Sequence, residues 1–194
     1  MISLRSVCVY CGSSSRVNRA YKDAAARLGT LLGEAGIELV YGGGRVGLMG
    51  ILADSAMAAG GRVVGIIPGH LKALEVDHSG ISELIVVESM HERKRLMVER
   101  ADAFVVLPGG LGTLDEAFEV VTWKQLRLHD KPVVIADIEG YWAPLLDLLD
   151  HICAAGFVGG GAARLYAVAE DVDDIIGVLR SQPAPLLPLD ITVI

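Results

Sequence analysis

Short apolar runs alternate with longer amphipathic segments along almost the whole chain. The apolar runs are typical of strands buried on both faces of a parallel sheet, and they predict strands at 4–10, 37–41, 62–67, 84–87, 103–107, 133–137 and 165–168. The other segments carry apolar residues at helical spacing, which predicts helices at 19–35, 48–59, 90–101, 117–123, 141–155 and 171–180. This alternation predicts an α/β fold: a doubly wound parallel sheet with right-handed crossovers and helices on both faces.

Composition changes this picture little. The chain has 194 residues, enough for a single domain with a sizeable core, which we expect at 1–182 with a proline-rich tail at 183–194. Hydrophobic residues make up 52% and charged residues 21%, which favours a packed globule. The net charge of −7 argues against nucleic acid and membrane surfaces as partners. No signal-peptide pattern begins the chain, so we expect a cytoplasmic protein.

A glycine-rich turn follows the predicted strand at 103–107 and leads into a helix. Its three glycines, Gly109, Gly110 and Gly112, let the backbone turn sharply and approach a ligand without a Cβ in the way. Free N–H groups at the positive end of a helix dipole form a site for phosphate. Asp115 and Glu116 place two carboxylates in what we expect to be the first turn of this helix. A site that only holds phosphate gains nothing from these acids.

A purely structural explanation exists for one of the two acids. Thr113 and Glu116 fit the T-x-x-E capping box, in which Thr caps the helix and Glu bonds back to the cap N–H. Acidic residues also suit the first turn of a helix for electrostatic reasons alone. Spacing therefore leaves capping and chemistry open for Glu116.

A second glycine-rich turn follows the predicted strand at 37–41. Gly42, Gly44 and Gly47 satisfy G-x-G-x-x-G between a strand and a helix, the context of a dinucleotide-binding fingerprint. The next strand ends in Pro68-Gly69 rather than in an acid that could hold a ribose, and Glu75 lies in the loop beyond. This disfavours a nicotinamide dehydrogenase and favours a mononucleotide or sugar phosphate; a turn needed only for packing is the alternative.

Two further clusters carry polar or reactive groups. Arg93, Lys94 and Arg95 begin a helix, where basic runs usually face solvent, but this helix leads into the strand that ends at the Gly109 turn. Its basic groups can therefore meet a phosphate or the two acids. Cys8 and Cys11 match C-x-x-C on a strand, where residues three apart point to opposite faces, so redox or zinc use is not expected.

Together these motifs resemble the LOG (Lonely Guy) family. The resemblance rests on P-G-G-x-G-T-x-x-E ending at Glu116, on M-H-E-R-K around Arg93, and on Y-G-G-G-x-x-G-L-M-G beginning at Tyr41. It extends to T-W-x-Q-L after Val121 and to H-D-K-P after Leu128, and so covers nearly the whole chain. The family consists of cytokinin riboside 5′-monophosphate phosphoribohydrolases, long mislabelled as lysine decarboxylases, with a Rossmann-like fold and usually a dimeric state.

The resemblance implies a set of site residues. Arg93 and Glu116 would be the catalytic pair, Glu75 matches a family ligand position, and Asp115 stands where the family commonly has Glu. The nucleotide site would be lined by Lys94, Gly109, Gly110, Leu111, Gly112, Thr113, Leu114, Asp115 and Thr122. From their own turn motif we add Gly42, Gly43 and Gly44 to the substrate-binding set. No metal or cofactor is expected.

The implied reaction is hydrolysis through an oxocarbenium-like ribose. The glycine turn would hold the 5′-phosphate of AMP or prenylated AMP, Glu116 would stabilise the cationic sugar or activate water, and Arg93 would orient Glu116. The main alternative is a protein that binds nucleotides or pterin cofactors without turning them over. A homodimer is expected, with the helix after the Gly109 turn as its interface and Trp123 hidden there.

Overall fold

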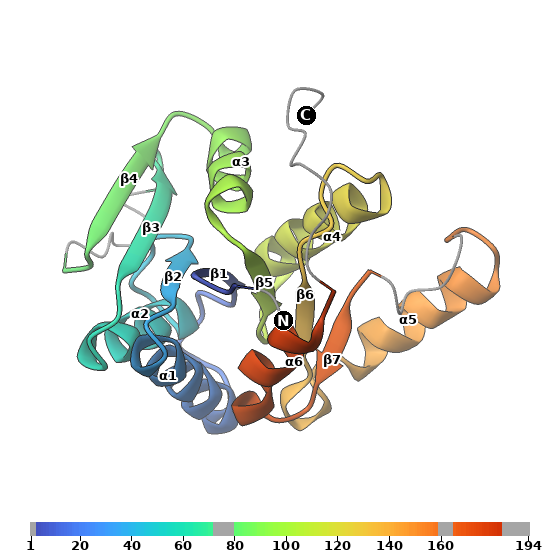
Figure 1. Ribbon diagram of the computed structural model, residues 1–194, viewed down its shortest axis with the longest axis horizontal. Coiled ribbons are helices and arrows are strands. Elements are labelled where there is room, and N and C mark those ends of the chain that lie inside the picture. Colours follow the sequence, from blue (N-terminus) through green and yellow to red (C-terminus); the bar gives the residue numbers. More distant parts are fainter. Residues whose placement is uncertain (1–2, 72–79, 159–164, 184–194) are drawn as a thin grey trace.

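A parallel sheet forms the centre of the protein (Figure 1). The computed structural model describes residues 3–71, 80–158 and 165–183, and in this part of the chain the sheet has seven strands in the order β4-β3-β2-β1-β5-β6-β7. Every neighbouring pair is parallel. The strands are β1 (Ser6–Tyr10), β2 (Glu38–Tyr41), β3 (Val63–Pro68), β4 (Glu83–Val87), β5 (Ala103–Val106), β6 (Val133–Ala136) and β7 (Ala167–Ala169).

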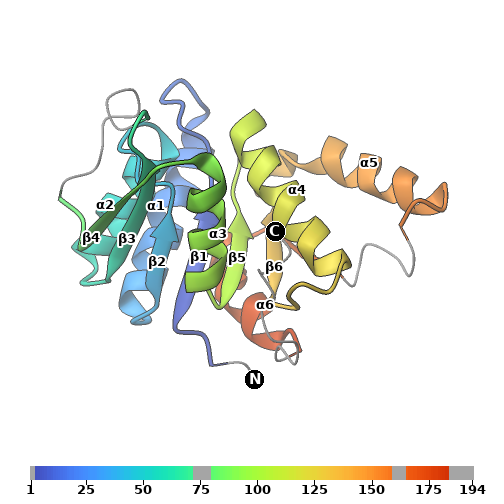
Figure 2. The same ribbon diagram turned by 90° about the horizontal axis from the view of Figure 1, so that it is seen from above.

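Helices cover both faces of the sheet, as the sequence predicts (Figure 2). They are α1 (Arg19–Glu34), α2 (Leu48–Ala58), α3 (Met90–Arg100), α4 (Leu111–Gln125), α5 (Ala143–Ala154) and α6 (Ile175–Ser181). One core cluster joins one face of the sheet to α1, α2 and α6, and a second joins the other face to α3 and α4, with α5 packed at its edge. The doubly wound fold with a single core sheet is therefore confirmed.

Element boundaries differ from the sequence prediction most at α4, which begins at Leu111 instead of residue 117, and also where short 3-10 turns precede a helix. Ile138–Gly140 is such a turn, and α5 starts only at Ala143, where Pro144 fits the first helical turn. Val172–Asp174 likewise precedes α6. Residues 159–164 and nearly all of the predicted tail lie outside the described residues.

The chain changes direction across the sheet beside β1. It runs from β1 outward to β4, and α3 then carries it back to β5, on the other side of β1. The loops that follow β1 and β5 lie together at the carboxyl edge, where the Gly12 N–H donates to the Pro108 carbonyl at 3.1 Å. Ligands of doubly wound sheets bind at such a switch point.

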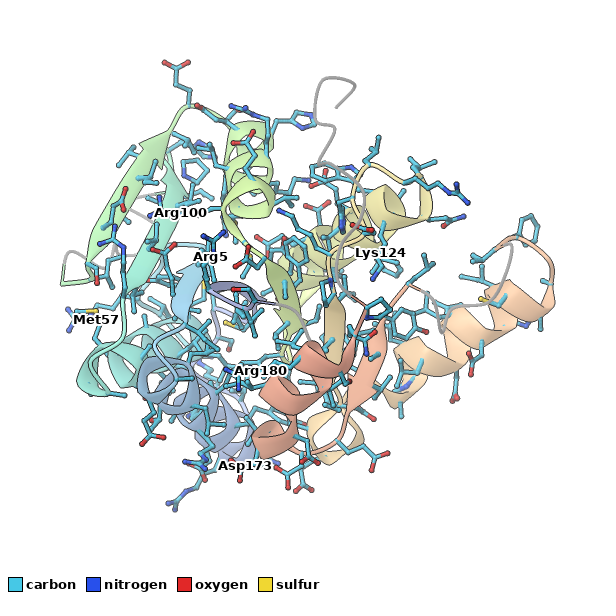
Figure 3. All side chains as sticks on the ribbon, in the orientation of Figure 1. Arg5, Met57, Arg100, Lys124, Asp173 and Arg180 are labelled. Atoms are coloured by element: carbon cyan, nitrogen blue, oxygen red, sulfur yellow. The ribbon has the colours of Figure 1, made fainter. Side chains whose placement is uncertain are left out.

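The opposite edge of the sheet is closed by a cluster of four charges. Arg62 and Arg100 (the latter labelled in Figure 3) each bond to both Glu38 and Glu83, at N–O distances from 2.6 to 3.0 Å for the closest contacts. The cluster ties β2, β4 and the end of α3 together. All four side chains remain partly exposed, so this network stabilises the fold only modestly.

Cys8 and Cys11 belong to different core clusters, on opposite faces of the sheet. Burial raises the pKa of both thiols far above the ordinary value. They are therefore inert as a redox pair, as their strand position predicts. None of the helices in the described ranges has the length and apolar character needed to cross a bilayer.

Candidate active site

A hollow of about 250 Å³ opens at the carboxyl edge of the sheet, where α3 and α4 approach the loop after β1. We call it the Arg93–Glu116 hollow. Its lining comprises Cys11, Gly12, Ser13, Met49, Leu71, Met90, Arg93, Gly110, Leu111, Gly112, Thr113, Asp115 and Glu116. The glycine turn after β5 and the basic segment of α3 thus meet at one site, although they are separate in the sequence.

Arg93 and Glu116 form a buried ion pair in this hollow. Arg93 Nη2 donates to Glu116 Oε1 at 3.1 Å, and the two residues are only 5% and 8% exposed. Burial of both charges is costly unless they are paired, so each holds the other in place. The pair leaves Arg93 Nε without a hydrogen-bond partner among the described residues.

A side-chain cap at Ser89, which was not predicted from the sequence, positions Arg93. Ser89 caps α3 by accepting the Glu92 N–H at 3.1 Å, and the Glu92 carboxylate accepts the Glu88 N–H at 3.0 Å. Arg93 follows immediately, and its own N–H bonds to the Ser89 carbonyl at 3.1 Å. The signal was present as S-x-x-E from Ser89 to Glu92. This cap fixes the start of α3 and hence the direction of the arginine.

The capping-box interpretation of Glu116 is wrong. Helix α4 begins at Leu111 with Gly110 as its cap, and no side chain caps it. Thr113 is already inside the helix, and Asp115 and Glu116 lie beyond its first turn. Glu116 therefore points to Arg93 on the neighbouring helix. Its carboxylate lines the hollow as the partner of Arg93.

The first residues of α4 face the same hollow. Gly110, Leu111, Gly112 and Thr113 all line it, and the first N–H groups of a helix have no partner within the helix. Together with the helix dipole they favour an anion at this point. Leu111 is 85% exposed, which leaves the approach to these groups open. The site thus combines an anion-binding helix end with a buried carboxylate.

Lys94 forms ion pairs with other residues of α4 than Arg93 does. Its Nζ lies 3.2 Å from Asp115 and 3.0 Å from Glu119, one turn further along α4, and it does not line the hollow. Although burial acts in the opposite direction, the hydrogen bonds that Lys94 donates to Glu119 and Asp115 hold the pKa of Lys94 above its ordinary value. Lys94 and Arg93 therefore clamp α3 to α4 through two adjacent contacts. Glu119 was not among the predicted site residues.

The glycine turn after β2 (Gly42 to Gly44) does not line the hollow. A Cβ on Gly42 would collide with the Arg93 guanidinium, so this glycine makes room for the arginine. Gly43 has φ 77° and packs against β3, and Gly44 is buried. The predicted ligand contacts of these three glycines thus have a packing explanation.

Two of the remaining predicted residues, Leu114 and Thr122, do not line the hollow. Glu75 lies outside the described residues. Leu114 is half-buried against the second core cluster, and Thr122 is exposed near the end of α4, away from the hollow. Trp123 is 7% exposed because it packs into the core of its own chain, so the expectation that only a partner copy hides it is wrong.

The H-D-K-P motif has a structural role. His129 is buried; one ring nitrogen bonds to the Val120 carbonyl at 2.9 Å and the other to the Lys131 N–H at 3.1 Å. Burial lowers the pKa of His129 to about 4, so the ring is neutral at neutral pH. Lys131 Nζ bonds to the carbonyls of Val98 and Ala101 at the end of α3, at 2.8 and 2.7 Å. The motif therefore fixes the far ends of α3 and α4.

Within the described ranges, no three His, Cys, Asp or Glu side chains are grouped so that they could hold a metal ion. The polar groups of the hollow are the Arg93–Glu116 pair, Asp115, Ser13, Thr113 and the end of α4.

Comparison with known proteins shows which family this chain resembles. The family model described as "possible lysine decarboxylase" matches residues 49–179. The cytokinin riboside 5′-monophosphate phosphoribohydrolase of Rhodococcoides fascians is 43% identical over 178 residues, covering 91% of this chain and 90% of that protein. LOG1 of Arabidopsis thaliana, which carries the same activity in its name, is 42% identical over 176 residues, covering 91% of this chain and 83% of its own.

A solved structure shares the fold at lower identity. The molybdenum cofactor (Moco) carrier protein of Chlamydomonas reinhardtii superposes with a TM-score of 0.70 at 21% identity, covering 91% of this chain and 96% of that chain. Similarity at this level shows the fold alone. The family-model match and the identity to the two phosphoribohydrolases show more: this chain belongs to the LOG family.

Proposed function

We propose that the protein hydrolyses the N-glycosidic bond of adenine-type nucleoside 5′-monophosphates and releases the free base and ribose 5-phosphate. The observation that carries the proposal is the buried Arg93–Glu116 pair in the same hollow as the uncapped end of α4. The Glu116 carboxylate suits a sugar that becomes cationic, and the N–H groups at the start of α4 suit its phosphate. The named activity of the relatives supports the same substrate class.

The geometry suggests how the residues share the reaction. The 5′-phosphate binds at the N–H groups of Gly110 to Thr113, which directs the ribose toward Glu116. As the bond between C1′ and the base nitrogen lengthens, the Glu116 carboxylate stabilises the positive charge on the sugar or accepts a proton from the attacking water. The water oxygen bonds to C1′, and the base leaves with the bonding electron pair and gains a proton. Arg93 keeps Glu116 aimed at the sugar.

The proposal requires the 5′-phosphate. Charge-assisted contacts at the end of α4 contribute binding energy of several kcal/mol, which the enzyme uses at the reacting bond. The value of kcat/KM should therefore be at least about a hundredfold higher for AMP than for adenosine, with release of free adenine as the assay. Equal efficiency on both substrates would contradict the proposal.

The base is expected to be an adenine with an apolar N6 substituent. Met49, Leu71, Met90 and Leu111 give the hollow an apolar wall, which supports a prenyl-type group. Incubation with AMP and with prenylated AMP, followed by chromatography of the free base, compares the two. Release of neither base, with both nucleotides bound, would favour the alternative of a nucleotide carrier.

We also propose that the protein is a homodimer that uses the exposed side of α4. Leu111, Phe118 and Leu126 are 85%, 39% and 63% exposed at helical spacing, with exposed Thr122 between the last two. A second copy that packs there would border the hollow and bring Thr122 toward the partner. Light scattering should give a dimer mass at micromolar concentration, and Phe118→Asp should shift it to the monomer. A parent protein that is monomeric would overturn this assignment.

The nucleotide substrate suggests a cytoplasmic location, which microscopy of a tagged chain tests.

A further inference from the structure

A second hollow lies on the other side of the glycine turn. Its volume is about 290 Å³, and it is lined by Tyr21, Tyr141, Leu48 and the loop after β1, together with Pro108, Gly109 and Gly110. We call it the tyrosine hollow. Gly109 lines only this hollow, Leu111 lines only the Arg93–Glu116 hollow, and Gly110 lines both. The turn, together with Gly12 and Ser13, which also line both hollows, is therefore the wall between them.

One side chain of the tyrosine hollow bonds to this wall. The Tyr141 hydroxyl donates to the Gly109 carbonyl at 2.6 Å. Its ring is held edge-on against Tyr21, with a centroid distance of 5.2 Å, and against Trp142, at 4.7 Å. The chain beside it is fixed as well, because the Trp142 N–H donates to the Asp137 carboxylate at 2.5 Å. Tyr141 thus holds the carbonyl from a well-anchored position.

The geometry of the peptide unit transmits this contact to the other hollow. The Gly109 carbonyl and the Gly110 N–H belong to one trans peptide, so they point in opposite directions. Because the Gly109 carbonyl accepts from Tyr141 in the tyrosine hollow, the Gly110 N–H points away from Tyr141, and Gly110 also lines the Arg93–Glu116 hollow. Two successive glycines have no Cβ to resist rotation of this peptide. A rotated peptide would present its carbonyl oxygen, a negative dipole end, to the incoming phosphate.

We propose that Tyr141 is a positioning residue that sets the orientation of the Gly109–Gly110 peptide for binding of the substrate phosphate. The inference rests on the proposed function for the identity of the anion. It assigns to the tyrosine hollow a role in substrate affinity although no atom of Tyr141 reaches the Arg93–Glu116 hollow.

The test compares Tyr141→Phe with Tyr21→Phe, since each removes one hydroxyl from the tyrosine hollow. The Tyr21 hydroxyl has no hydrogen bond to the turn in the described structure. Titration calorimetry with inorganic phosphate and with AMP should give dissociation constants about tenfold higher for Tyr141→Phe, the usual effect of losing one oriented hydrogen bond. Tyr21→Phe should match the parent. In turnover, KM for AMP should rise about tenfold while kcat stays within about threefold.

An unchanged phosphate affinity in Tyr141→Phe, or an equal loss in Tyr21→Phe, would overturn the assignment. Melting temperatures of both variants separate a loss of fold from a loss of affinity, and a Tyr141→Phe protein that loses affinity only through a lowered melting temperature counts against it. Phosphate binding does not require hydrolysis. A parent protein that binds phosphate but leaves AMP intact would therefore refute the proposed function and leave this test in place.

Discussion

The two glycine-rich turns follow β2 and β5, the strands on either side of β1, and they look alike in the sequence but differ in their surroundings. The turn after β2 serves packing: Gly42 makes room for Arg93, and Gly47, with φ 71°, lies against the backbone of Ser13. The turn after β5 starts a helix whose first residues line the Arg93–Glu116 hollow. The turn after β2 makes room for Arg93, and the turn after β5 places the start of α4 at the hollow, where we propose that the phosphate binds.

The difference lies in what surrounds each glycine. At Gly42 and Gly47 the space for a Cβ is filled by atoms of the protein itself, whereas Gly110 and Gly112 have nothing within 4 Å of that position. Open space at a helix end is where a ligand fits. A glycine motif between a strand and a helix therefore signals close approach, and only the fold decides whether a ligand or the chain itself approaches.

The largest effect on stability is expected for Gly47→Ala. Ala at positive φ is strained, and its Cβ would also meet the Ser13 backbone, so the free energy of unfolding should fall by about 2–4 kcal/mol. Gly60→Ala is the control, because Gly60 has φ 79° but open space around it. It should lose only about 1–2 kcal/mol. Urea denaturation measures both, and equal losses would show that packing at Gly47 is unimportant.

Gly42→Ala should reduce turnover although Gly42 does not line the hollow. Its Cβ would push the Arg93 guanidinium away from Glu116, and we expect kcat to fall about 10–100-fold. The same change in an Arg93→Ala background should have little further effect, because both act on one group. If the two losses add fully, Gly42 does not act through Arg93.

Gly112→Ala should separate stability from affinity. Ala is the better helix former, so the free energy of unfolding should rise by about 0.5–1 kcal/mol. The new Cβ points toward the helix N-terminus and into the space proposed for phosphate, so KM for AMP should rise about tenfold. Calorimetry and steady-state kinetics test the two effects. An unchanged KM would place the phosphate elsewhere.

The fold could be predicted from the sequence because its elements are strongly patterned. Strands such as β1 and β5 are buried at every residue, and helices with clear apolar spacing lie between strands. The approach of Arg93 to the Gly109 turn could also be predicted from the sequence, because α3 leads directly into β5. Both depend on local pattern and chain order.

The details of the site depended on contacts that spacing does not encode. Thr113 and Glu116 fit a capping box, but α4 starts two residues before Thr113, at Leu111, with Gly110 as its cap. Glu119 looked like an ordinary surface residue until the packing of α3 on α4 brought Lys94 beside it. Trp123 was expected at a dimer interface because helical periodicity does not tell which side of α4 meets the sheet of its own chain.

The central claim is that Glu116 is a catalyst rather than a structural partner of Arg93. Glu116→Gln keeps the shape and an oxygen for Arg93 Nη2, but it removes the charge beside a buried guanidinium, so stability should fall by about 1–3 kcal/mol. Well below the melting temperature, AMP should still bind near the parent affinity while turnover per folded molecule falls about 10²–10⁴-fold. A folded Glu116→Gln protein that cleaves AMP at the parent rate would contradict the account.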